Sequence, residues 1–255
     1  MKKGKKIIVA NWKMNPGTLA EARLLFAKIK RAASRLENVL TIICPPFAYL
    51  AAFAHSGATR VALGAQNASS QNGGRLTGEV SPEMLRDLGV SYCIVGHSER
   101  RALGETDEVI AAKVRAVVAE GMTPILCVGE RARDAEGRYF EILKNQLAAS
   151  LARLPRASFR TLVIAYEPLW AIGKSAREAM SPRAVCETSI FIRKVLTDLV
   201  GAENAQQPQI LYGGSVEEEN TAAILAEGGV DGLLVGHISL ESERFITILK
   251  RADVV

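Results

Sequence analysis

Short runs of β-branched and aliphatic residues recur eight times along the 255-residue chain, and helical patterns lie between them. Each run is almost continuously apolar, which is typical of parallel strands that are buried on both faces. We predict strands at Lys6–Ala10, Val39–Ile43, Val61–Ala65, Tyr92–Val95, Pro124–Val128, Thr161–Tyr166, Gln209–Tyr212 and Gly232–Val235. Eight strands, each followed by helical sequence and with no linker between them, fit the size of a closed (β/α)8 barrel.

A doubly wound sheet is the alternative architecture. Such sheets usually carry a GxGxxG motif after the first strand, whereas here the first strand continues into Asn11-Trp12-Lys13. We therefore predict an α/β fold in which residues 1–255 form a single domain, a (β/α)8 barrel of the TIM type.

Helix signals occur in several of the intervening segments. Thr18 and Glu21 predict a capping box at the start of a helix that ends at Ala33. Ser215 and Glu218 predict another one before a helix at Glu219–Glu227. In the segment 106–120 we expect one apolar inner face, made of Val109, Ala112, Ala116 and Val117.

Composition narrows the class of protein. The formal net charge of +5 is small for a protein whose main partner is a nucleic acid. The longest stretch without Asp, Glu, Lys or Arg contains Pro45 and Pro46, so we expect no membrane span. The apolar run Ile7–Ala10 is too short for a secretion signal. The cysteines show no paired spacing, and we expect a cytoplasmic protein with free thiols at Cys44, Cys93, Cys127 and Cys186.

Polar and ionisable side chains follow most of the predicted strands. In barrels of this type, catalytic groups lie where the strands end and the following loops begin. The candidates are Asn11 and Lys13 after strand one, Gln66 and Asn67 after strand three, His97 and Glu99 after strand four, Glu130 after strand five and Glu167 after strand six.

Three of these side chains suit proton transfer. Glu167 follows an apolar run, and apolar surroundings raise the basicity of a carboxylate, so we expect a proton abstractor that works near neutral pH. His97 could act as an acid, a base or a neutral hydrogen-bond donor, and Lys13 could hold an anion. Each has a structural alternative: an ion pair at the barrel end for Glu167, a satisfied structural histidine for His97 and a solvated side chain for Lys13.

Glycines after the last two strands indicate where an anion would bind. Gly213-Gly214-Ser215 follows strand seven and Gly236-His237 follows strand eight. Backbone N–H groups at such places hold phosphate, and barrels bind phosphate preferentially at these two loops. The His and carboxylate residues show no metal-ligand spacing, and there is no nucleotide fingerprint. The residues alone thus predict a phosphate-holding barrel with a carboxylate base, a histidine and a lysine around one site. These groups fit proton abstraction beside a carbonyl, and they do not identify the sugar.

Eight short segments, in order along nearly the whole chain, match the motifs of one enzyme family. They are Asn11–Asn15, Gly64–Asn67, Thr77–Ser81, Gly96–Arg101, Cys127–Glu130, Ala165–Gly173, Tyr212–Val216 and Asp231–Gly236. On these segments the sequence closely resembles the triosephosphate isomerases. The resemblance implies interconversion of dihydroxyacetone phosphate and D-glyceraldehyde 3-phosphate through an enediolate, in glycolysis and gluconeogenesis, with no cofactor.

The resemblance also implies a catalytic set. Glu167 would be the base that takes a proton from one carbon and returns it to the next. Neutral His97 would donate to the substrate oxygens and shuttle protons between them, and Lys13 would stabilise the phosphate and the enediolate charge. Asn11 would hold a substrate oxygen, and Glu99 would orient Lys13 or His97.

Substrate enclosure and assembly follow from the same resemblance. Ile172 and Leu234 would close over the base, and Pro168–Ala176 would be a mobile lid. The loop Gln71–Gly78 would interdigitate with a second copy in a homodimer and bring Thr77 near the partner's site. The phosphate would be held by backbone N–H groups of Gly173, Ser215, Gly236 and His237.

The sequence departs from the family pattern in three places. The end of the lid reads Lys174–Met180 instead of a Thr-Gly-Lys-like hinge, and Arg101–Glu105 looks one residue shorter than usual. His237 stands where the family has a second glycine, and its side chain either turns outward or adds a pH-dependent contact to the phosphate.

Three alternative functions stay open on the sequence. A paralogous aldose–ketose isomerase would act on a larger phosphorylated ketose, such as a tetrulose phosphate, and the lid and strand-eight loops are where such a change would appear. A phosphate-binding barrel without catalysis would be favoured by loss of a catalytic residue, yet the set is intact. A Schiff-base aldolase would need a buried lysine on an inner strand, whereas Lys13 lies just beyond strand one.

Overall fold

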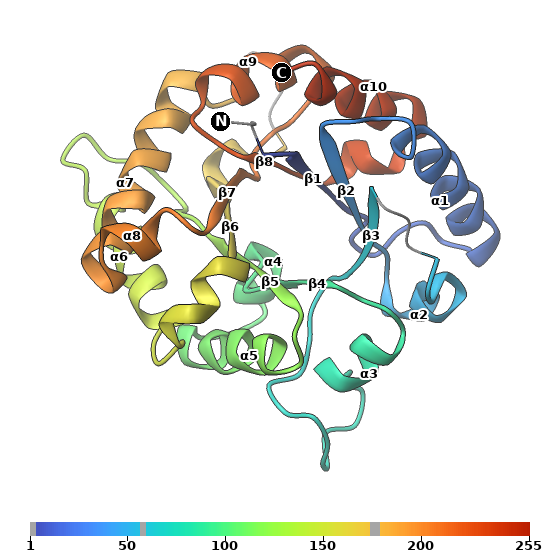
Figure 1. Ribbon diagram of the computed structural model, residues 1–255. Helices are drawn as coiled ribbons and strands as arrows, with labels where there is room; N and C mark the ends of the chain where they lie inside the picture. The colour runs from blue at the N-terminus through green and yellow to red at the C-terminus, as the bar shows by residue number, and fades with distance from the viewer. Residues whose placement is uncertain (1–3, 57–59, 174–178) are drawn as a thin grey trace.

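The computed structural model describes residues 4–56, 60–173 and 179–255. Within these ranges eight parallel strands pair in chain order and close into a barrel that is surrounded by helices (Figure 1). The strands are β1 Lys6–Asn11, β2 Val39–Cys44, β3 Val61–Ala65, β4 Tyr92–Val95, β5 Thr123–Val128, β6 Val163–Tyr166, β7 Gln209–Tyr212 and β8 Gly232–Val235. The predicted barrel is therefore confirmed, and the predicted strand boundaries lie within two residues of these.

The helices lie on the outside of the barrel, with short 3-10 turns at several strand ends. The α-helices are α1 Leu19–Ala33, α2 Phe47–Leu50, α3 Pro82–Asp87, α4 Ser98–Ala102, α5 Asp107–Ala119, α6 Tyr139–Ser150, α7 Pro182–Val200, α8 Ala202–Ala205, α9 Glu218–Glu227 and α10 Ser242–Asp253. The 3-10 helices are η1 Ala51–Phe53, η2 Arg156–Thr161, η3 Leu169–Ala171 and η4 His237–Leu240. Thr18 forms the predicted capping box with Glu21 at the start of α1.

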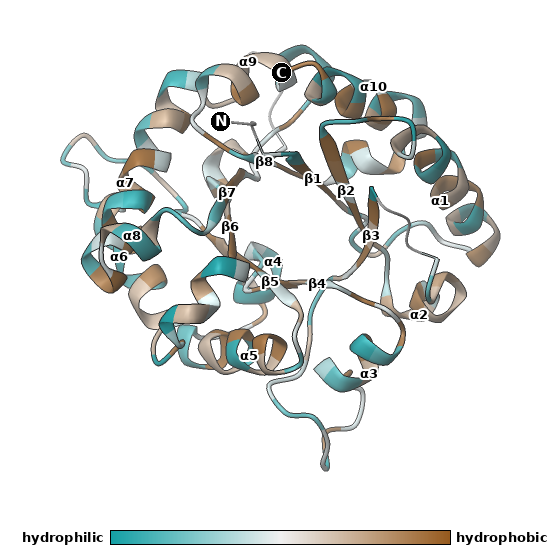
Figure 2. Ribbon diagram, viewed as in Figure 1, coloured by the Kyte–Doolittle hydropathy of each residue, from teal (hydrophilic) through white to brown (hydrophobic). Residues whose placement is uncertain are grey.

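Alternation along each strand divides the apolar side chains into two packed layers. In β1, Ile7 and Val9 belong to the cluster that fills the barrel, and Ile8 and Ala10 belong to the cluster between strands and helices. Successive strand residues point to opposite sides of the sheet, so both faces must be apolar. Figure 2 shows the result, with hydrophobic strands at the centre and hydrophilic residues spread over the surrounding helices.

The predicted inner face of α5 is wrong by about one residue. Val109 is 40% exposed, whereas Ile110, Val114 and Val117 are buried and form a stripe with a spacing of four and three residues. Neighbouring positions on a helix differ by about 100°, so a stripe through Ile110 leaves Val109 facing solvent. Ala112 and Ala116 lie at the edges of the buried face.

The predicted capping box at Ser215 and Glu218 is also wrong. The chain stays extended to Glu217, which is the N-cap of α9 and forms a capping box with Asn220. The Ser215 hydroxyl instead donates to the carbonyl oxygen of Ala171 at 2.7 Å. Ser215 thus joins the loop after β7 to the segment that follows β6.

Three further features concern an exposed loop, the lengths of the helices and the cysteines. The loop between β3 and α3 projects away from the barrel (Figure 1), and its residues 71–79 are exposed. In the part of the chain that is described, no helix has the length and apolar character needed to cross a membrane. The thiols are free, as expected, and burial raises the pKa of Cys93 to about 12.

Candidate active site

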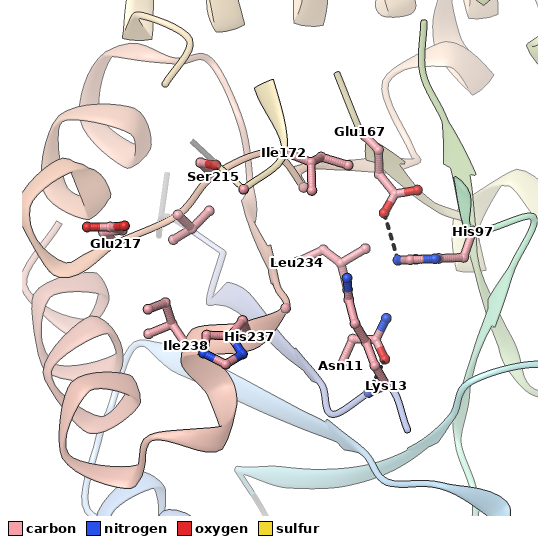
Figure 3. Close-up of a pocket in the computed structure, with 15 residues that line it drawn as sticks. Asn11, Lys13, His97, Glu167, Ile172, Ser215, Glu217, Leu234, His237 and Ile238 are labelled. Atoms are coloured by element: carbon pink, nitrogen blue, oxygen red, sulfur yellow. Dashed lines mark hydrogen bonds and ion pairs between the residues drawn. The ribbon is translucent and has the colours of Figure 1, made fainter. Parts of the chain in front are cut away.

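A cavity of about 290 Å³ opens at the carboxyl ends of the strands (Figure 3). Every predicted site residue except Glu99 lines it, namely Asn11, Lys13, His97, Glu167, Ile172, Gly173, Ser215, Leu234, Gly236 and His237. The cavity therefore brings together side chains from strand ends that are far apart in the sequence.

Strand register explains why these residues meet. Tyr166 at the end of β6 lies opposite Val128 in β5 and Tyr212 in β7, so the three strands end at one level. The residues that follow them therefore share one rim of the barrel. Glu167 is fixed there by its N–H group, which donates to the carbonyl oxygen of Val128 at 2.8 Å.

Glu167 and His97 form a buried pair at the bottom of the cavity. Their side chains are directed toward each other in Figure 3, and Glu167 Oε1 lies 3.0 Å from His97 Nε2. Glu167 is 3% exposed and His97 is 7% exposed. The second oxygen, Oε2, accepts a hydrogen bond of 3.0 Å from the backbone N–H of Ser98. The carboxylate is thus held on both oxygens.

The hydrogen bonds around His97 fit a neutral ring of one tautomer. The backbone N–H of Glu99 donates to Nδ1 at 3.3 Å, so Nδ1 acts as an acceptor and carries no proton. The ring proton then lies on Nε2, where it is donated to Glu167. A neutral imidazole with a proton on Nε2 is a hydrogen-bond donor toward the cavity.

The pKa of Glu167 is lowered, contrary to the expectation of raised basicity. Burial raises it, but the neighbouring His97 and the N–H of Ser98 lower it by more. Burial likewise lowers the pKa of His97, while the Glu167 carboxylate raises it, and the net shift is upward. Apolar burial was predictable from the sequence around Glu167; the two donors that oppose it come from a different strand.

Lys13 is held in place by its own backbone as well as by its side chain. Its φ of 52° is in the left-handed region, which costs a non-glycine residue of the order of 1 kcal/mol. Asn11 Oδ1 accepts from the N–H of Lys13 at 3.0 Å, and Gln66 donates to its carbonyl oxygen at 2.8 Å. Lys13 Nζ lies 2.7 Å from Glu99 Oε1. Glu99 therefore touches Lys13 from outside the cavity.

The opposite wall of the cavity consists of the loops after β7 and β8. At Gly214 a Cβ atom would lie 2.3 Å from the Tyr212 hydroxyl, so only glycine fits there. His237 begins η4, and N–H groups in the first turn of a helix have no intrahelical acceptor. Among the described residues, this wall therefore offers backbone donors, and its acidic side chain is that of Glu217.

The His237 side chain turns outward. It is 81% exposed, and its Nε2 lies 3.8 Å from Glu241 Oε1 on the following turn. Leu234 is 3% exposed and lies between the two walls of the cavity, whereas Ile172 is 37% exposed at its rim. The segment Lys174–Met180 was singled out in the sequence, and residues 174–178 lie outside the described residues.

The sequence analysis did not identify two residues that hold Glu167 in place without lining the cavity. At Gly129 a Cβ atom would lie 1.8 Å from the carbonyl oxygen of Glu167, so glycine permits the close approach of two loops. The N–H of Ser98 was also missed. Both residues lie inside motifs quoted from the sequence, but nothing in a linear pattern specifies which neighbour a backbone group meets. Within the described ranges, no group of three or more His, Cys, Asp or Glu could hold a metal ion.

Comparison with known proteins gives a consistent result. Residues 6–252 match the family model described as triosephosphate isomerase. A triosephosphate isomerase of Symbiobacterium thermophilum is 44% identical over 249 residues, which are 96% of this chain and 96% of that protein. The one of Thiobacillus denitrificans is 44% identical over 251 residues, 97% and 98% of the two chains. That of Idiomarina loihiensis is 40% identical over 250 residues, 97% and 98%.

Proposed function

The chain belongs to the triosephosphate isomerase family, and we propose that its cavity carries out the family's reaction with Glu167 as the base. The protein is an isomerase that interconverts dihydroxyacetone phosphate and D-glyceraldehyde 3-phosphate. The observation that carries the residue assignment is the 3.0 Å contact between Glu167 and a neutral His97, beside Lys13 and opposite a wall of backbone donors.

Proton abstraction requires Glu167 to leave its resting contacts. In the structure its two oxygens accept from His97 and Ser98, and these bonds keep its pKa low. A carbonyl or hydroxyl oxygen of the substrate that accepts the hydrogen bond from His97 Nε2 replaces one of these two bonds to Glu167. The freed carboxylate, still buried, becomes more basic. It then takes a proton from one carbon of the substrate and returns it to the neighbouring carbon.

His97 and Lys13 stabilise the enediolate that forms between these two transfers. Neutral His97 donates from Nε2 to the substrate oxygens, and it moves a proton from one oxygen to the other. Lys13 supplies a positive charge beside the developing oxyanion, and Asn11 lies next to it on the same strand end. Charges placed before the reaction act strongly in a site that excludes water. Glu99 orients Lys13 through the 2.7 Å contact.

The phosphate end of the substrate binds between the opposite wall and Gly173, which belongs to the segment after β6. Its donors are the backbone N–H groups of Gly173, Ser215, Gly236 and His237. Leu234 and Ile172 cover the reacting carbons, which keeps water away from the enediolate and hinders its decomposition. Anchoring one end of a small substrate fixes its carbons relative to Glu167, and this orientation supplies much of the rate.

Turnover with purified protein tests the proposal. The protein should convert dihydroxyacetone phosphate to glyceraldehyde 3-phosphate with no added cofactor, and a tetrulose phosphate should be a poorer substrate. A clear preference for the tetrulose phosphate would favour the paralogous isomerase, which the comparisons do not support. If the barrel only binds phosphate ligands and does not catalyse, dihydroxyacetone phosphate should gain no deuterium from the solvent. A Schiff-base aldolase would form a covalent adduct with the substrate that borohydride traps.

Assembly and location belong to the same proposal. We propose a homodimer in which the projecting loop Gln71–Gly78 of one copy enters the other and places Thr77 near its site. Exposure of this loop and of Met14, which is 93% exposed, supports the presence of a partner surface. Sedimentation would show twice the monomer mass. We also propose a single domain over residues 1–255 and a cytoplasmic location, since the buried thiols suit a reducing compartment.

A further inference from the structure

Arg133 takes no part in the proposed reaction, yet its guanidinium group joins several elements of the barrel. It lies in the loop between β5 and α6. Its Nε donates to Glu130 Oε1 at 3.0 Å, and one terminal nitrogen donates to the Tyr166 hydroxyl at 2.9 Å and to Thr188 Oγ1 at 2.7 Å. The same nitrogen lies 3.9 Å from the sulfur of Met180. One side chain thus contacts β6, α7 and Met180, which lies shortly before α7.

Aromatic rings enclose the same guanidinium group. Its Cζ lies 4.5 Å from the ring centroid of Tyr139 and 5.4 Å from that of Trp170. The Tyr139 ring packs on Phe140 at 4.2 Å, and Phe140 packs on Phe191 of α7 at 4.3 Å. A planar cation held between rings loses little freedom and is attracted by both. Trp170 is therefore held against a platform that is anchored to α7.

Glu130 makes this contact network sensitive to the charge of Arg133. Glu130 is fully buried, and its Oε1 accepts from the Tyr166 hydroxyl at 2.8 Å and from the indole N–H of Trp170 at 2.9 Å. A buried carboxylate needs a positive partner, and removal of that partner is strongly destabilising. Arg133 therefore fixes Glu130, and Glu130 fixes the indole of Trp170.

Trp170 connects this network to the cavity. Trp170 lies in η3, and the two residues that follow the end of η3, Ile172 and Gly173, line the cavity. We propose that Arg133 is a positioning residue for the isomerisation, which holds Ile172 and Gly173 at the cavity wall through Glu130 and Trp170. This inference rests on the proposed function, because it assigns Gly173 to the phosphate and Ile172 to the cover over the base.

The first test compares Arg133→Met and Arg133→Lys with Arg131→Met, an exposed arginine two positions away that serves as the control for loss of charge. We expect kcat/KM for dihydroxyacetone phosphate to fall by about tenfold to a hundredfold in Arg133→Met, since a shift of about 1 Å in a binding group costs that much. Part of the loss should appear as a higher KM, through Gly173. Arg133→Lys should recover only part of it, because an ammonium group cannot make the forked contacts. Arg131→Met should match the wild type.

Fluorescence gives a readout that a role in stability alone would leave unchanged. The chain has two tryptophans, and Trp12 is fully buried, so acrylamide quenching reports mainly on Trp170. Quenching should increase in Arg133→Met. In Arg133→Met the buried carboxylate of Glu130 has lost its positive partner, and the double variant Arg133→Met/Glu130→Gln removes that charge. Its melting temperature should therefore rise above that of Arg133→Met. Its kcat/KM should stay low and its quenching should stay increased.

Each outcome decides the proposal. Wild-type kinetics or unchanged quenching in folded Arg133→Met would overturn it, as would full kinetic recovery in the double variant. An inactive wild-type protein would instead refute the proposed function, and the quenching experiment would still report whether Arg133 holds Trp170.

Discussion

Shortening Glu167 by one methylene group tests how finely the base is placed. In Glu167→Asp the carboxylate retreats by one C–C bond, about 1.5 Å. The 3.0 Å contact to His97 Nε2 would then lengthen to about 4.5 Å. The backbone cannot follow, because its N–H is bound to Val128 at 2.8 Å and its carbonyl oxygen lies against Gly129. Misplacement on this scale costs about a hundredfold or more in rate.

We therefore expect kcat of Glu167→Asp to fall by about 10²- to 10³-fold, which corresponds to about 3–4 kcal/mol in the barrier. KM should stay within about threefold, because the phosphate donors on the opposite wall are unchanged. Steady-state assays in both directions measure the two parameters, and a melting curve confirms that the variant is folded. A kcat within about threefold of the wild type would refute the assignment of Glu167 as the base.

Three further predictions follow from other parts of the site. Lys13→Ala should lose about 2–4 kcal/mol of transition-state stabilisation, seen as a lower kcat/KM; if kcat and KM both stay near wild type, Lys13 is a bystander. The lowered pKa of Glu167 means that its ionised form adds stability above the unfolded-state pKa and that this stability is lost as pH falls through the folded-state pKa. The difference in unfolding free energy between wild type and Glu167→Gln should accordingly shift against the wild type as the pH falls below about 4.5, and a pH-independent difference would contradict this. Gly129→Ala should destabilise the protein by about 3 kcal/mol in denaturant titrations, whereas Gly17→Ala, where a Cβ meets nothing within 4 Å, should not; equal effects would disprove the close-packing argument.

The architecture was predictable because each strand carries its own local signal. A strand with a continuous apolar run, such as Val163–Tyr166 or Gly232–Val235, is stable only when both faces of its sheet are buried. Few architectures can bury eight such strands that alternate with helices along the chain. The face of α5 was less predictable, since Val109 and Ile110 are adjacent apolar residues and only tertiary packing selects between them. The N-cap of α9 is Glu217 instead of the predicted Ser215 for a similar reason. The Ser215 hydroxyl donates to the carbonyl oxygen of Ala171, which belongs to a different loop.

The location of the site was also predictable, but its electrostatics were not. Strand ends in a barrel share one rim, so Lys13, His97 and Glu167 could be placed together from their positions alone. The lowered pKa of Glu167 depends first on His97 and then on the N–H of Ser98, which is 69 positions away in the chain. The contacts of Arg133 with residues up to 55 positions away are likewise invisible in a linear pattern.

Hydrogen exchange at the substrate carbons tests the central claim, that Glu167 carries a proton between neighbouring carbons. Dihydroxyacetone phosphate is incubated in D2O with wild-type protein and with Glu167→Gln, and NMR follows deuterium at the carbon next to the carbonyl and in the product. The wild type should incorporate deuterium and Glu167→Gln should do so at least about a hundredfold more slowly. Exchange at the wild-type rate in folded Glu167→Gln would show that another group moves the proton.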